Sequence, residues 1–90
     1  MQLKDFHYLY HKVGGDVIHF ELSDEKVKSG DSTVRYYGYL AANGAWIIME
    51  ENLTNGTYRY AAGKTLYETH WELREGKEYV LYSALTIGER

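Results

Sequence analysis

Four histidines are the side chains of this sequence best suited to hold a metal ion, namely His7, His11, His19 and His70. His7 and His11 are four positions apart, which on a β-strand puts them on one face but about 13 Å apart along the strand. Two ligands at that separation cannot share one ion, so a site would need ligands from several strands. The spacing indicates no such set, and we expect neither a metal nor another cofactor.

The residues that enzymes use for covalent or acid–base catalysis show no recognisable arrangement. No serine lies in a nucleophile elbow, and no glycine-rich stretch precedes a helix. The carboxylates fall on expected turns and on outward strand positions. The sequence has no cysteine, which excludes thiolate metal sites and disulfides. We therefore expect that the protein is not an enzyme.

Aromatic side chains are the main candidate binding residues of the chain. Ten Tyr, two Trp and two Phe make up 16% of the sequence, and Tyr combines a large ring with a polar tip, as at interfaces and in small β cores. The central segment 33–62 places rings and charges of both signs on one expected sheet face. The candidate binding residues on that face are Arg35, Tyr37, Tyr39, Trp46, Glu50 and Arg59. This face suits sugars or a protein groove; the alternative is that it packs against the N-terminal hairpin.

Two Asn-Gly dipeptides, Asn43-Gly44 and Asn55-Gly56, predict the corners of an antiparallel three-stranded meander. Two-residue turns would place Tyr39 opposite Ile48 and Glu51 opposite Tyr60, with residues 45–54 as the central strand. The core face in this register has Glu51 as its only charge. Its other members are Tyr36, Leu40, Ala42, Ala45, Ile47, Met49, Leu53, Tyr58, Tyr60 and Ala62.

The N-terminal part predicts a first hairpin from residues 3–12 and 16–22, closed at Gly14-Gly15. Tyr10 then faces His19. Apolar groups fall on both faces of this hairpin, which predicts cover on two sides, by the meander and by a neighbouring subunit. The charged segment 23–32 lacks alternation and is expected to be a loop.

The C-terminal part is ambiguous. A helix would place His70 on one side, whereas a strand would place Trp71 inward and Arg74 outward; the alternation favours the strand. A further strand is expected at 78–85, and residues 86–90 are expected to fray.

The composition predicts a single all-β domain spanning 1–90, a small antiparallel β-sandwich or partly open barrel of six or seven strands. The net charge of −3 comes without a basic stripe, so nucleic acid is not an expected partner. The first residues lack the apolar segment of a signal peptide, and no apolar run is long enough for a membrane span. The thin core and the surplus of tyrosine predict a homo-oligomer.

Residues 36–82 carry a pattern of aromatic residues and glycines at fixed spacing. Its first marks are Tyr36-Tyr37-Gly38-Tyr39, Ala45-Trp46-Ile47-Ile48 and Tyr60-Ala61-Ala62-Gly63. Its last marks are Tyr67, Trp71, Arg74 and Tyr79. This pattern resembles a family of short tailed-bacteriophage proteins, many of them encoded among virion genes.

The resemblance implies a non-enzymatic structural protein of the virion, an assembly or attachment module in a neck, tail or baseplate. Its partners would be other virion proteins. The alternative rests on the aromatic face and not on the resemblance: a carbohydrate-binding module for host recognition. Two departures stand out, because the family has a longer loop where this chain has Asn43-Gly44, and it lacks the turn at 75–77. The N-terminal hairpin lies outside the resemblance.

Overall fold

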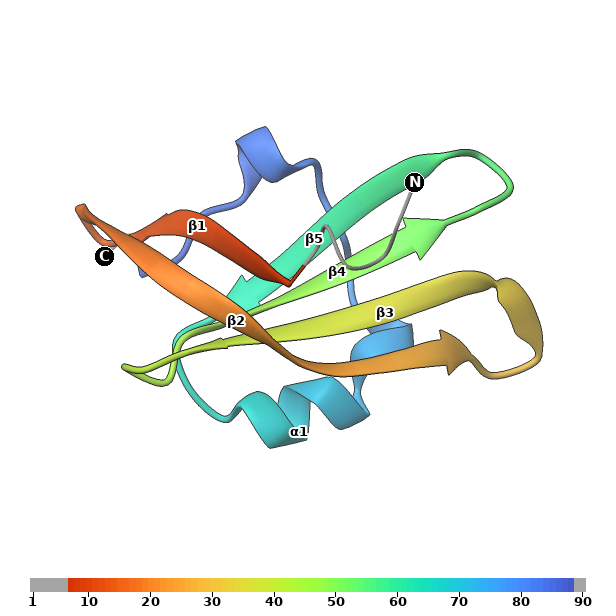
Figure 1. Cartoon of the computed structure of the whole chain (residues 1–90), viewed down its shortest axis with the longest axis horizontal. Helices are drawn as coiled ribbons and strands as arrows, with labels where there is room; N and C mark the ends of the chain where they lie inside the picture. The colour runs from red at the N-terminus through yellow and green to blue at the C-terminus, as the bar shows by residue number, and fades with distance from the viewer. Residues whose placement is uncertain (1–6, 89–90) are drawn as a thin grey trace.

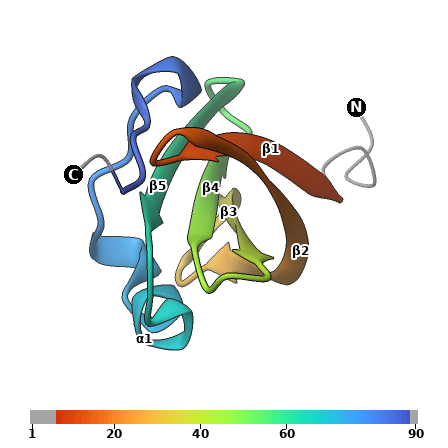
Figure 2. The same cartoon turned by 90° about the vertical axis from the view of Figure 1, so that its left-hand side faces the viewer.

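The computed structural model describes residues 7–88 and contains one antiparallel sheet of five strands in the order β1-β2-β3-β4-β5. The strands are β1 (Tyr8–Val13), β2 (Asp16–Lys28), β3 (Asp31–Ala41), β4 (Trp46–Asn52) and β5 (Thr57–Gly63). A short helix α1 (Tyr67–Glu72) and two 3-10 turns, η2 (Arg74–Gly76) and η3 (Tyr82–Ala84), follow. The sheet curls into a half-barrel (Figures 1 and 2). The all-β class is confirmed, but the described residues form five strands rather than six or seven.

The first hairpin has the expected register. Tyr10 lies opposite His19 and Leu9 lies opposite Phe20, and Gly14 takes a φ of 65° in the tight turn, which glycine adopts without a steric penalty. Residues 3–6 of the expected first strand lie outside the described residues.

The loop expected at 23–32 is instead the outer part of a long hairpin, because β2 continues to Lys28 and β3 begins at Asp31. The register shifts between Leu22 and Asp24 and again near Lys28. Such bulges break the two-residue alternation that marks a strand. The hairpin closes at Gly30, which has a φ of 76°.

The corner at Asn43-Gly44 is a three-residue loop, not a two-residue turn. The amide of Gly44 donates to the Ala41 carbonyl over 3.0 Å, and the Ala41 amide donates to the Ala45 carbonyl over 2.9 Å. Gly44 has a φ of 94°, as in a turn followed by a left-handed residue. The extra residue shifts the β3–β4 register by one, so Tyr39 lies opposite Ile47. The side chains of β3 therefore point to the opposite face from the one predicted.

The second corner, at Asn55-Gly56, is a four-residue loop. The Gly56 amide donates to the Asn52 carbonyl over 2.8 Å, and Glu51 lies opposite Tyr58 rather than Tyr60. A shift of two residues keeps every side chain on its predicted face. The prediction that β4 is a central strand paired on both sides is confirmed.

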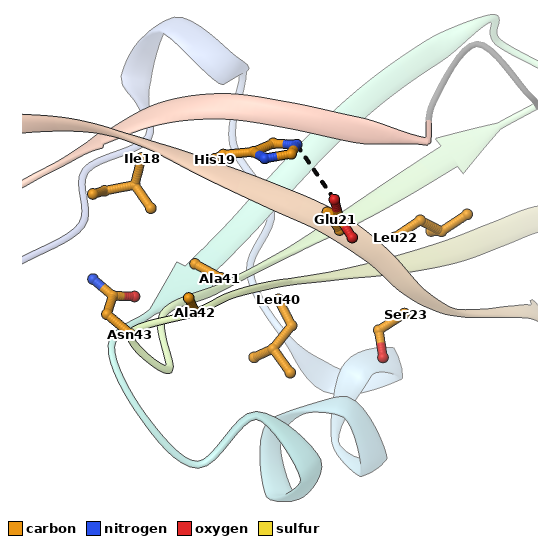
Figure 3. A pocket seen from close by; sticks show the side chains of 9 residues that line it. All are labelled: Ile18, His19, Glu21, Leu22, Ser23, Leu40, Ala41, Ala42 and Asn43. Carbon is orange, nitrogen blue, oxygen red and sulfur yellow. Dashed lines mark ion pairs between the residues drawn. The ribbon is translucent and has the colours of Figure 1, made fainter.

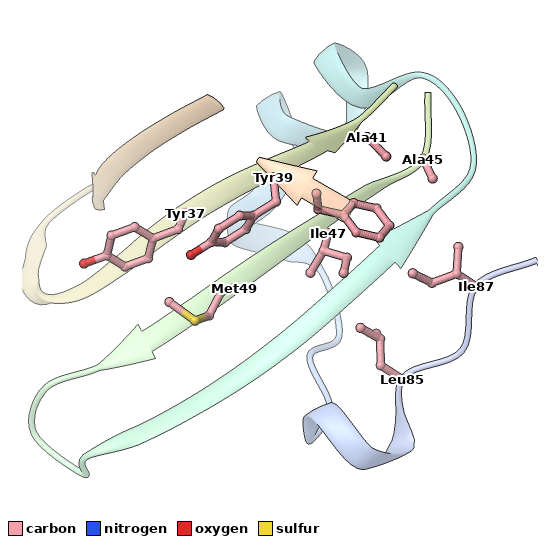
Figure 4. Packing of buried hydrophobic residues seen from close by; sticks show 9 residues of the cluster. Tyr37, Tyr39, Ala41, Ala45, Ile47, Met49, Leu85 and Ile87 are labelled. Atoms are coloured by element: carbon pink, nitrogen blue, oxygen red, sulfur yellow. The ribbon is translucent and has the colours of Figure 1, made fainter. Parts of the chain in front are cut away.

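The concave face of the half-barrel holds the larger core (Figure 4). Its buried members are Phe20, Tyr37, Tyr39, Ala41, Ala45, Ile47, Met49, Leu85 and Ile87. Glu51 is 3% exposed on the same side, and its Oε1 accepts a hydrogen bond of 2.8 Å from the Tyr37 hydroxyl. A buried carboxylate is tolerated when such donors replace water.

The convex face carries a second core under α1. Tyr67 and Trp71 of the helix pack with Val34, Tyr36, Trp46 and Ile48 of the sheet. The strand expected over this segment is wrong, although the inward position of Trp71 is confirmed by its exposure of 8%. The hydrogen bonds of a helix run within the helix, so α1 can pack against a sheet face without pairing to an edge strand.

The C-terminal segment lies between the two edge strands on the concave side. Val80 forms a single bridge with Tyr60 of β5, and the Gly14 amide donates to the Ile87 carbonyl over 2.9 Å. The strand expected at 78–85 is therefore wrong beyond that bridge. Fraying is also wrong for the described part of 86–90, because Ile87 is 2% exposed; residues 89–90 lie outside the described residues.

Candidate functional site

The aromatic residues predicted to form a binding face are split between the two sides of the sheet. Tyr37 and Tyr39 point into the concave core and are fully buried. Trp46 lies on the convex side, 2% exposed, where its Nε1 donates to the Thr65 carbonyl over 2.7 Å. The one-residue register shift at Gly44 causes this split. No single surface of the described chain presents these three rings together.

The three charged members of the predicted face also separate. Glu50 and Arg59 are directly opposite each other on β4 and β5, on the convex side. Glu50 is half-buried and accepts a hydrogen bond of 3.0 Å from the Tyr36 hydroxyl. Arg35 lies opposite Glu51 on the other side of the sheet. The hydrogen bond from Tyr36 holds Glu50 in the fold, and the three charged residues do not lie on one face of the sheet.

Exposed rings occur instead on the outer face of the β1–β2 hairpin. Tyr8 and Tyr10 are each 56% exposed. The Tyr10 and His19 rings stack with centroids 5.0 Å apart and an interplanar angle of 23°. Tyr8 meets the His19 ring edge-on at 5.4 Å. We refer to Tyr8, Tyr10 and His19 as the tyrosine–histidine ladder.

The ladder is exposed because the rest of the chain covers other parts of the sheet. Helix α1 packs on the convex face over β3 and β4, and the C-terminal segment contributes to the concave core. Figure 2 shows α1 at the far end of the curl from the β1–β2 hairpin. The outer face of the hairpin has no cover from the described residues.

A groove of about 670 Å³ adjoins the ladder, between β2 and the β3–β4 turn (Figure 3). Ala41, the last residue of β3, pairs with Phe20 of β2. Residues 16–19 of β2 lie beyond that pair and bond to β1 alone, which leaves the groove open beside them. The residues around the groove are Ile18, His19, Glu21, Leu22, Ser23, Leu40, Ala41, Ala42 and Asn43. Its volume falls in the range of ligand-binding clefts.

The groove combines apolar and polar groups. Leu40 contributes an apolar surface that is 36% exposed. Glu21 Oε2 lies 3.9 Å from His19 Nε2, an ion pair when the imidazole is protonated. Ser23 and Asn43 add neutral hydrogen-bonding groups. This arrangement can hold a flat apolar surface against the rings and orient it through polar contacts.

The sequence carried one signal for this site. The first hairpin has apolar side chains on both faces, which predicted a partner on its outer side as well as the meander on its inner side. The groove itself had no signal, because it depends on where β3 ends relative to β2.

Comparison of the chain with protein-family models, with curated proteins and with solved structures gives no match. Among residues 7–88, no helix is both long enough and apolar enough to span a membrane.

Proposed function

We propose that the protein is a structural component of a bacteriophage virion, an assembly or attachment module that binds its partner through the tyrosine–histidine ladder and the adjoining groove. The observation that carries the binding role is the pair of half-exposed tyrosines, Tyr8 and Tyr10, beside a groove of about 670 Å³. The virion setting rests on the resemblance of residues 36–82.

The chemistry of the ladder suits a protein contact. Tyr supplies contact area at a low cost in conformational entropy, and a few such residues usually dominate the binding energy of an interface. The His19–Glu21 pair at the edge of the rings adds charge that can select a partner. The ladder is therefore the first surface to test for a virion partner.

A second copy of the chain is among the proposed partners. Strand β1 is an edge of the sheet, and an edge strand offers backbone groups that can pair with another strand. At this edge the Tyr10 carbonyl already accepts a hydrogen bond from the Tyr82 hydroxyl, so a second strand would pair with the remaining groups. Tyr8 and Tyr10 would then lie at the contact.

Three measurements test this proposal. Mass spectrometry of purified particles of the phage that encodes the chain should detect the protein, and its absence would refute the virion role. In sedimentation and in pull-down experiments with virion proteins, the unmodified chain should bind its partner. A double Tyr8→Ser, Tyr10→Ser variant should not.

The matched control for that variant is a double Leu73→Ser, Leu81→Ser chain, because both leucines are 58% exposed and neither belongs to the ladder or lines the groove. We expect the control to bind normally. Equal binding by both variants would show that the ladder is not the contact, provided that circular dichroism shows both to be folded.

Carbohydrate binding is the second candidate function. The observation that favours it is the position of Glu21, Ser23 and Asn43 around a groove that adjoins stacked rings, since sugars combine an apolar face with hydroxyl groups at its edge. A glycan array with the isolated chain tests this function. Binding that is lost in Asn43→Ala and in Tyr10→Ser would favour it, whereas no binding to any glycan would exclude the carbohydrates on the array.

A further inference from the structure

A second cluster of chemically capable side chains lies on the convex side, next to α1. The Lys77 Nζ is 2.8 Å from His70 Nδ1 and 5.3 Å from the centroid of the Trp46 ring. The His70 ring stacks on Trp46 with centroids 4.7 Å apart. The amine of Lys77 is therefore held against an indole and an imidazole.

Lys77 has no acidic partner in this position. Among residues 7–88 no Asp or Glu carboxylate forms an ion pair with it. A lysine ammonium normally gains stability from such a partner, and burial without one favours the neutral amine. Burial lowers the pKa of Lys77, whereas the contact with the Trp46 ring and the hydrogen bond to His70 both favour the ammonium and oppose that shift.

A hollow of about 500 Å³ opens beside this amine. Trp46, His70 and Lys77 contribute to its wall, together with the backbone around Gly63. The other titratable groups around it are Lys64 and Glu78, both on the exposed rim. The hollow has room for a small organic molecule next to Lys77.

We propose that Lys77 is a reactive amine and that this hollow admits a small aldehyde or ketone, which condenses with Lys77 to form an imine. The site is separate from the tyrosine–histidine ladder, so this inference and the proposed function can fail independently. It assigns Lys77 as a site of covalent modification or covalent ligand binding.

The condensation balances without an oxidant or reductant. The neutral amine attacks the carbonyl carbon, a C–N bond forms, and the π electron pair moves to the oxygen, which takes up the proton that the nitrogen loses. The resulting carbinolamine then loses water as the C=N bond forms. One water leaves for each imine, and hydrolysis reverses the step.

His70 acts as a positioning residue for this amine. Burial and the neighbouring charge of Lys77 lower the pKa of His70, so its ring is neutral near pH 7 and Nδ1 can accept a hydrogen bond from Lys77. That bond fixes the amine at the wall of the hollow. Replacing the ring nitrogen should release Lys77 without removing it.

Reductive trapping tests the proposal on the full chain. Limiting glycolaldehyde with sodium cyanoborohydride at pH 7 should modify Lys77 several-fold faster than the exposed Lys26, as measured by peptide mass spectrometry. Lys26 is the matched control because it lies on a solvent-facing part of β2. Modification of Lys77 at a rate equal to or below that of Lys26 would overturn the inference.

A variant and a pH profile test the geometry. His70→Phe keeps a ring on Trp46 but removes the acceptor, and we expect the preference for Lys77 to disappear. If circular dichroism shows that this variant is not folded, the test is the pH profile of modification in the unsubstituted chain. As the pH is raised, the rate at Lys77 should begin to increase at a lower pH than the rate at Lys26. Coincident profiles, or an unchanged preference in folded His70→Phe, would contradict the assignment.

Discussion

Gly38 of β3 lies directly under the hydroxyl group of Tyr67, the first residue of α1. A Cβ at Gly38 would overlap Tyr67 Oη and would lie 2.9 Å from Cε3 of Trp71. The Tyr67 hydroxyl passes over this gap and donates to Asp24 Oδ2 over 2.7 Å. The absence of one side chain thus allows the helix to pack on the sheet and to bond to a neighbouring strand.

Gly38→Ala should destabilise the protein by about 1–3 kcal/mol, because the added methyl group forces α1 away from the sheet. The control is Gly76→Ala, since a Cβ at Gly76 would meet nothing within 4 Å. Chemical denaturation of both variants measures the difference. Equal midpoints would show that the helix can move without cost.

The last marks of the aromatic pattern in residues 36–82 lie in or next to this helix, namely Tyr67, Trp71, Arg74 and Tyr79. Arg74 lies over the Trp71 ring, with Cζ 4.7 Å from the centroid, and its Nη1 donates to the Trp71 carbonyl over 2.8 Å. The Tyr79 hydroxyl donates to the Arg74 carbonyl over 2.6 Å. The outward, solvent-facing position expected for Arg74 is therefore wrong. These four residues are packing positions of the fold.

The sequence predicted the places of the turns better than their lengths. Gly44 and Gly56 both take positive φ, as the Asn-Gly dipeptides indicate. Loop length depends on which backbone amides pair, and here the Asn43 side chain accepts a hydrogen bond of 3.0 Å from the Ala45 amide. The Asn-Gly dipeptide itself does not tell a two-residue turn from a three-residue loop. Because the loop is one residue longer than predicted, the side chains of β3 lie on the opposite faces of the sheet. The predicted binding face is therefore divided between the two cores.

Gly44→Ala should destabilise the protein by about 1 kcal/mol or more, because the φ of 94° at this position is strained for any side chain. Gly15→Ala is the control: Gly15 is not among the positive-φ residues, and a Cβ there would meet nothing within 4 Å. Thermal unfolding compares the two. A larger loss for Gly15→Ala would contradict the three-residue loop.

The helix and the C-terminal segment were not predictable from alternation. Trp71 is buried on a helix as it would be on a strand, so its apolar character does not separate the two. Ile87 enters the core from an irregular segment, where no period exists to mark it. Long-range packing decides both, and single-sequence patterns report mainly local preference.

Ile87→Ala should destabilise the protein by about 2–5 kcal/mol, as expected for truncating a fully buried aliphatic side chain. Leu81→Ala, a truncation at a position that is 58% exposed, should change the stability by less than about 0.5 kcal/mol. Urea denaturation gives both values. Similar small effects would mean that the C-terminal segment does not pack between the edge strands.

Alkaline pH should unfold the protein, because its half-buried and buried tyrosines resist ionisation. Burial raises the pKa of Tyr82 to about 12. Burial also raises the pKa values of a larger group, namely Tyr36, Tyr37, Tyr39, Tyr58, Tyr60, Tyr67 and Tyr79. In the unfolded chain these groups ionise near pH 10. Above that pH the unfolded state therefore binds fewer protons than the folded state.

The sign follows from this difference. The free energy of unfolding is independent of these groups below about pH 9 and falls as the pH rises through 10 toward 12, by up to about 1.4 kcal/mol per pH unit for each such tyrosine. Denaturant titrations at pH 8, 10 and 11 measure the slope. Tyr82→Phe should reduce the slope of the unfolding free energy against pH by the contribution of one tyrosine. Ser83→Ala, a neighbouring change that removes no titrating group, should leave the slope unaltered. Constant stability from pH 8 to 11 would show that these hydroxyl groups are accessible to water in the folded protein.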